Sequence, residues 1–110
     1  MSTWETQLRK GVAELAVLAV LSREEAYGYR IVERLRELDG LALSESTVYP
    51  ILTRLAREGL LDVRTEAWAA GPTRRYYRLT REGQRRLRDL SESWRRVSSS
   101  LTKLLEGVQP

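Results

Sequence analysis

The chain has 110 residues and a formal net charge of +4, and it contains neither cysteine nor histidine. Its length fits one domain with one modest core. Without thiols and imidazoles there can be no disulfide, thiolate nucleophile or imidazole base, and nearly all zinc chemistry is excluded, so we expect no metal, no cofactor and no enzymatic activity.

The first predicted helix covers residues 5–21 and is apolar on almost every side after Glu14. This pattern indicates a helix that is buried on more than one side, which is more burial than a small monomer usually provides. The apolar run is far shorter than the ~20 residues that cross a bilayer, and it contains Glu14. We therefore expect a soluble, cytoplasmic protein that does not bind membranes.

The second predicted helix follows a break at Ser22 and Gly28. Ile31, Leu35 and Leu38 repeat at helical spacing. Asp39-Gly40 provides the stop signal at its end.

The third predicted helix lies in the stretch SESTVYPILTRLAREGLL, residues 44–61, and contains Pro50. Proline inside a helix costs about 3 kcal/mol but is tolerated in the first turn. We therefore expect the helix to begin close to Ser46, with Ser44 or Ser46 as its cap and Pro50 at the end of the first turn.

One face of this third helix is apolar and the other carries hydroxyls and arginines. The outward positions and flanks are Ser46, Thr47, Tyr49, Pro50, Thr53, Arg54 and Arg57. Ser and Thr hydroxyls and Arg guanidinium groups are suited to base edges and phosphates in a major groove. Considered alone, the helix fits an ordinary solvated surface better than a DNA-binding face.

A two-stranded hairpin is predicted next. Period-two alternation indicates a strand over residues 61–68, the loop AAGPT follows, and RRYYRLT returns as the second strand, with Arg74 and Arg75 at its start. Residues 60–110 hold eleven basic and six acidic side chains, so this half is the basic one. Two helices joined by a short turn and followed by such a hairpin predict a winged helix-turn-helix, in which the wing arginines contact phosphates.

The last predicted helix runs from Thr80 to about Glu106-Gly107 and has an apolar residue at alternating spacings of three and four. This predicted dimer seam comprises Leu87, Leu90, Trp94, Val97, Leu101 and Leu104. A second copy of the chain is the expected partner, and packing within the same chain is the alternative. We expect residues 1–80 to form the DNA-binding domain and residues 81–107 the dimerisation helix, packed with the first helix as one compact unit.

Four segments together resemble one protein family. They are AYGYRIVERL, STVYPILTRLAREGLL, GPTRRYYRLTREGQRRL and ESWRRVSSSLTKLL. The chain is similar over residues 8–106 to the PadR family of bacterial transcriptional regulators, in the short subtype with a single C-terminal helix. The resemblance implies that Tyr49-Pro50 begins the recognition helix, that Tyr27, Gly28 and Tyr29 lie near the DNA backbone, and that Arg74 and Arg75 belong to the wing.

Trp94 in the middle of the seam has two interpretations. It is either interface core or part of an effector site with Leu90 and Val97. In multidrug-binding members of the family that the chain resembles, a tryptophan in the matching context lines a pore between subunits and stacks on planar aromatic ligands.

These observations predict a mainly α (α+β) protein, a winged helix-turn-helix with a long C-terminal dimerisation helix. The expected function is that of a homodimeric repressor that binds a palindromic operator in double-stranded DNA and is released by a small-molecule effector, with a planar aromatic compound as the candidate. A winged helix that docks a partner protein without sequence-specific DNA binding is the alternative, although the basic wing argues against it.

Overall fold

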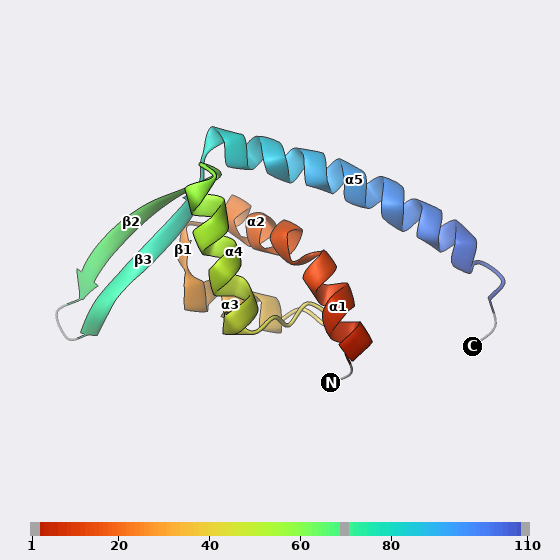
Figure 1. The fold of residues 1–110 in the computed structure, drawn as a ribbon, viewed down its shortest axis with the longest axis horizontal. Helices are drawn as coiled ribbons and strands as arrows, with labels where there is room; N and C mark the ends of the chain where they lie inside the picture. Colours follow the sequence, from red (N-terminus) through yellow and green to blue (C-terminus); the bar gives the residue numbers. More distant parts are fainter. Residues whose placement is uncertain (1–2, 69–70, 109–110) are drawn as a thin grey trace.

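The computed structural model describes residues 3–68 and 71–108, which form five helices and a three-stranded sheet. In chain order these are α1 (Thr3–Gly11), α2 (Ala13–Arg23), β1 (Ala26–Tyr27), α3 (Gly28–Arg36), α4 (Glu45–Arg57), β2 (Leu61–Trp68), β3 (Gly71–Leu79) and α5 (Arg81–Leu105). The β2–β3 hairpin extends from one side of the helical body and the C-terminal half of α5 from the other (Figure 1). This mainly helical winged-helix arrangement confirms the predicted fold class.

The hydrophobic core lies where α2, α3 and α4 meet the base of the sheet. Its fully buried large side chains are Val17, Leu18, Ile31, Val32, Leu35, Val48, Leu52 and Leu55. They come from the inward stripes of three helices, so these helices and the base of the sheet form one unit that holds the outward faces in place.

The single helix predicted over residues 5–21 is instead two helices. The break falls between Gly11, which ends α1, and Ala13, which begins α2. Gly11 favours a break because glycine is about 1 kcal/mol less favourable than alanine inside a helix. The burial is uneven as well: α2 supplies five buried residues, whereas α1 supplies none.

The structure adds a strand that the sequence analysis did not predict. Residues Ala26 and Tyr27 form β1, which pairs antiparallel with β3 through Tyr77 and Tyr76. Two residues are too few to show a period of two, so the sequence pattern carried no sign of this strand. The strand order is β1-β3-β2. β1 therefore joins the start of α3 to the base of the wing.

The recognition-helix candidate α4 begins one residue before Ser46, at Glu45, with Ser44 as its N-cap. Pro50 is therefore in the second turn and not at the end of the first, as was expected. Because proline has no N–H, the carbonyl of Ser46 loses its usual donor. Both Ser46 and Pro50 are exposed, so water can solvate that carbonyl.

The wing is a longer hairpin than predicted. Strand β3 begins at Gly71 and includes Pro72 and Thr73, which were expected in the loop. The remaining loop residues, 69–70, lie outside the described part of the chain. The strands pair from Leu61 with Leu79 to Trp68 with Gly71, with an irregularity between Glu66 and Trp68.

Helix α5 has the predicted bounds to within one or two residues. Thr80 caps it by accepting a hydrogen bond from the amide of Gly83 at 3.0 Å. A Cβ at Gly83 would overlap the backbone carbonyl of Leu60, so glycine allows α5 to start close to the end of α4. In the described residues no helix is both long and apolar enough to cross a bilayer.

Candidate nucleic-acid interface

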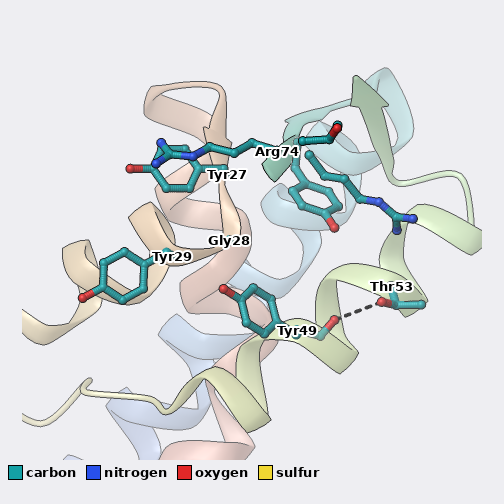
Figure 2. A pocket seen from close by; sticks show the side chains of 9 residues that line it. Tyr27, Gly28, Tyr29, Tyr49, Thr53 and Arg74 are labelled. Atoms are coloured by element: carbon teal, nitrogen blue, oxygen red, sulfur yellow. Dashed lines mark hydrogen bonds between the residues drawn. The ribbon is translucent and has the colours of Figure 1, made fainter. Parts of the chain in front are cut away.

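A groove with a volume of about 630 Å³ lies between the start of α3, α4 and the wing. We call it the tyrosine groove, and its lining includes Tyr27, Tyr29, Tyr49, Thr53, Arg74 and Arg75. Figure 2 shows the three tyrosines and Arg74 around it. The structure therefore brings together five of the predicted DNA-contacting residues from three separate segments of the chain.

The ring of Tyr49 occupies space in this groove that is open only because Gly28 has no side chain. A Cβ at Gly28 would overlap the Tyr49 ring, so the ring packs directly on the backbone at the start of α3. Burial, followed by the negative charge of Glu45, raises the pKa of Tyr49 above its usual value of 10.0. Its hydroxyl therefore stays protonated at neutral pH and can donate a hydrogen bond.

The wing is tied to α3 by alternating aromatic and cationic side chains. The Arg74 guanidinium lies 4.5 Å from the centroid of the Tyr27 ring (Figure 2), and that ring meets Tyr76 edge to face at 5.5 Å. Arg64 lies 4.6 Å from the centroid of Tyr76. These contacts place two guanidinium groups along the wing and orient Arg74 toward the groove.

The outward face of α4 presents small polar groups next to the groove. Ser46, Pro50, Thr53 and Arg57 are exposed, and Thr47 is half-buried. The hydroxyl of Thr53 donates to the carbonyl of Tyr49 at 3.1 Å, as drawn in Figure 2. That hydroxyl keeps its lone pairs available as acceptors.

Four predicted site residues do not line the groove, namely Ser46, Thr47, Pro50 and Arg54, and Arg54 is held elsewhere by ion pairs. Its guanidinium binds Glu14 Oε1 in α2 at 2.7 Å and Glu58 Oε1 at 3.3 Å. Glu14 Oε2 accepts from Arg86 in α5 at 2.8 Å. Burial acts to raise the pKa of Glu14, but the hydrogen bonds and charges of the two arginines outweigh it and lower that pKa below 4.5.

The predicted seam of α5 divides into two parts. Leu87 and Leu90 are partly buried against the core. Trp94, Val97, Leu101 and Leu104 are exposed, with 46% of Trp94 and 74% of Leu104 accessible to solvent. Within the described part of the chain, no element buries this second part of the seam.

A second hollow, of about 640 Å³, lies between α1, α2 and α5. We call it the Trp94 hollow, and its lining includes Leu8, Glu14, Arg86, Leu90, Trp94 and Val97. The structure thus places the three predicted effector-site residues in one cavity. Trp4 and Leu8 of α1 are each 70% exposed at this end of the molecule, which extends the apolar surface.

Sequence reasoning missed several residues of these two sites. Thr73 and Tyr77 line the tyrosine groove, and Glu14 and Arg86 line the Trp94 hollow. Glu14 did leave a signal, because it is a lone carboxylate in an apolar run. Its arginine partners are 40 and 72 residues away, so spacing could not identify them.

Comparison with known proteins places this geometry in a family. The family model described as "Transcriptional regulator PadR-like family" matches residues 17–89. A PadR family regulator from Eggerthella lenta is 37% identical, with a TM-score of 0.82 over 93% of this chain and 88% of its own. A PadR-like regulator from Bacillus cereus is 37% identical, with a TM-score of 0.79 over 92% of this chain and 98% of its own.

A third solved structure contains DNA. Bacillus subtilis PadR, solved in complex with operator DNA, is 31% identical to this chain, with a TM-score of 0.67. The similarity covers 72% of this chain and 46% of that one. Together with the extent of the family match, these relatives confirm the resemblance read from the motifs: the chain belongs to the PadR-like family of transcriptional regulators.

Proposed function

We propose that this regulator is a homodimer that binds double-stranded DNA, with α4 in the major groove and the wing along a neighbouring phosphate track. The observation that carries the proposal is the tyrosine groove, which is lined by Tyr49 of α4 and by Arg74 of the wing. Hydroxyl donors and guanidinium groups of this kind position a protein on the phosphate backbone. Bacillus subtilis PadR was solved in complex with operator DNA, and this relative supports DNA binding by the present chain.

Within this proposal the exposed face of α4 contacts base edges. Ser46, Thr53 and Arg57 point outward with Pro50 between them. Arg54 is occupied by Glu14 and Glu58, so we assign the base-reading guanidinium to Arg57. Tyr27, Tyr29, Tyr49, Arg74 and Arg75 then contact phosphates, and Thr47 contacts either phosphate or base.

The homodimer is proposed from the apolar surface at the other end of the molecule. The exposed part of the α5 seam and the exposed apolar side chains of α1 lie together at the Trp94 hollow. A second copy would cover them and place two recognition helices about 34 Å apart, which suits a palindromic operator. This assignment makes residues 81–107 the dimerisation helix.

For regulation we propose repression in the cytoplasm that a small-molecule effector relieves. The support is the Trp94 hollow, where an indole with apolar neighbours lies at the proposed subunit boundary. An apolar cavity with a few polar groups is typical of small-molecule sites. A planar, neutral aromatic compound fits best, because Glu14, the carboxylate that lines the hollow, is already paired with Arg54 and Arg86 and does not attract a cation.

The proposal is tested by the salt dependence of binding to an operator selected from a random pool of duplexes. We expect log K to fall with log salt concentration at about 0.9 per phosphate contact between roughly 50 and 200 mM. Replacing Arg74 and Arg75 together with alanine should weaken binding to all sequences alike and reduce the slope by about two. Fluorescence anisotropy measures both quantities.

The matched control removes two arginines from α5 instead of the wing. Arg95 and Arg96 are exposed and lie outside the tyrosine groove. Their double alanine variant should keep the slope nearly unchanged. Binding that is insensitive to salt, or an equal loss in both double variants, would contradict the proposed placement of the wing on DNA.

A further inference from the structure

Glu14 is a carboxylate in helix α2, whose buried side chains are otherwise apolar and belong to the core. It is followed in α2 by the apolar run Leu15–Leu21, and its side chain is only 22% exposed. Each of its two oxygens accepts from a different arginine, at 2.7 Å from Arg54 and 2.8 Å from Arg86. Glu14 thereby bridges α4 and α5.

The two arginines lie near the two candidate sites, Arg54 on the proposed recognition helix and Arg86 at the Trp94 hollow. Arg54 is on α4, next to Thr53 on the proposed base-contacting face. Arg86 is on α5 and lines the Trp94 hollow together with Glu14. Whatever fills that hollow therefore contacts the same carboxylate that holds α4.

A partly buried carboxylate is costly when it loses its partner. If α4 rotates about its axis, Arg54 moves away from Glu14, and the outward face that carries Thr53 turns with it. The second contact of Arg54, with Glu58, lies within one continuous stretch of chain at a spacing of four residues. That contact cannot fix α4 relative to the rest of the fold, whereas the contact with Glu14 can.

We propose that Glu14 is a positioning residue that fixes the rotation of α4 and couples α4 to α5 through Arg54 and Arg86. This inference rests on the proposed DNA-binding function for its consequence, because the orientation of α4 determines which bases it reaches. The competing explanation is an ion pair that stabilises the whole fold equally and has no effect on how α4 is held.

Hydrogen exchange of the free protein distinguishes the two explanations without DNA. We compare Glu14→Gln, which keeps the side-chain shape, with Arg86→Gln and with the double variant. Both single variants should raise exchange severalfold at amides of α4 relative to those of α3. The increase in α4 exchange should be no larger in the double variant than in Glu14→Gln alone, because Arg86 acts on α4 only through Glu14.

Glu24→Gln is the matched control for this experiment. Glu24 follows α2 directly and pairs with Arg30 at 3.4 Å, so the substitution also removes one carboxylate that has an arginine partner. It should leave α4 exchange unchanged. Equal increases in α3 and α4, additive effects of Glu14→Gln and Arg86→Gln, or no change in α4 would each overturn the proposal.

The functional consequence is measured on a duplex selected from a random pool by the wild-type protein and on a scrambled duplex. Glu14→Gln should reduce the ratio of the two affinities about tenfold, which corresponds to about 1.4 kcal/mol. Glu24→Gln should keep that ratio, and a Glu14→Gln protein that also keeps it would overturn the inference. If selection enriches no sequence, the proposed DNA-binding function fails, and hydrogen exchange still decides whether Glu14 positions α4.

Discussion

Tyr49 makes one contact with its ring and another with its backbone carbonyl. The absence of a Cβ at Gly28 lets the ring lie on the start of α3, and the carbonyl of Tyr49 accepts from Thr53 within α4. Helices α3 and α4 are therefore interlocked at the groove and not only through the buried core. A side chain introduced at Gly28 should consequently displace the ring of Tyr49.

We predict that Gly28→Ala displaces the Tyr49 ring. A new methyl group in a packed site usually costs about 1–3 kcal/mol. Stability should fall by this amount, and affinity for the selected operator should fall about tenfold, since Tyr49 then leaves the phosphate track. Urea unfolding and anisotropy measure the two effects.

The control for this prediction is Gly11→Ala. A Cβ at Gly11 would meet no atom within 4 Å, so the substitution should not lower stability. If Gly28→Ala retains wild-type stability and affinity, the ring can relocate without loss and the interlock has no functional role.

Also at the residue scale, the side-chain direction of Arg57 could be predicted from the sequence, whereas that of Arg54 could not. The helical wheel placed both on the outward half of α4, and the structure agrees that Arg57 is exposed. Arg54 lies at the edge of that half, where the presence of an acidic partner decides its direction. That partner, Glu14, is 40 residues away and on a helix whose angle to α4 no local pattern specifies.

At the scale of elements, strong periodicity gave reliable predictions and short or interrupted segments did not. The inward stripe of α4 and the bounds of α5 follow from side-chain spacing and capping residues. The two-residue strand at Ala26 depends on tertiary contacts, because it is too short to create a pattern, and the break after Gly11 was marked in the sequence by a single glycine. The gathering of the tyrosines likewise required β1 to bring α3 to the wing.

Helix α5 has different environments along its length. Gly83 is buried and Leu87 and Leu90 pack on the core, whereas the seam from Trp94 onward is exposed. A substitution in the exposed part can therefore separate dimer formation from folding of the single chain.

We predict that Leu101→Glu prevents dimer formation while each chain stays folded. Leu101 is 48% exposed in the single chain, so a carboxylate there remains hydrated until a partner covers it. Burying that charge at the interface should raise the dimer dissociation constant at least about a hundredfold. Sedimentation velocity at several concentrations gives the constant, and circular dichroism checks the fold.

Ser99→Glu is the matched control because residue 99 lies on the opposite side of α5 and is exposed. Its dimer should be as stable as that of the wild type. A Leu101→Glu protein that remains dimeric would mean that the subunits associate through another surface.

At the scale of the whole molecule, the two sites are formed by different elements around one hydrophobic core. The tyrosine groove is formed by α3, α4 and the wing, and the Trp94 hollow is formed by α1, α2 and α5. A ligand in the hollow changes DNA affinity only if it binds one arrangement of the subunits, or one orientation of α4, better than another. The two affinities must then change by the same factor, whichever partner is added first.

We therefore predict that Trp94 binds planar, neutral aromatic compounds and that this binding opposes DNA binding. Offset stacking on an indole contributes about 0.5–1.5 kcal/mol beyond the burial of area, so Trp94→Ala should weaken the ligand at least about tenfold and Trp94→Phe less. Isothermal calorimetry with a panel of flat aromatics measures this without interference from the other tryptophans. For a compound that binds, the factor by which it weakens operator affinity should equal the factor by which the operator weakens its own. If Trp94→Ala stays dimeric and binds every compound as tightly as the wild type, the indole is interface core and an effector, where one exists, binds elsewhere.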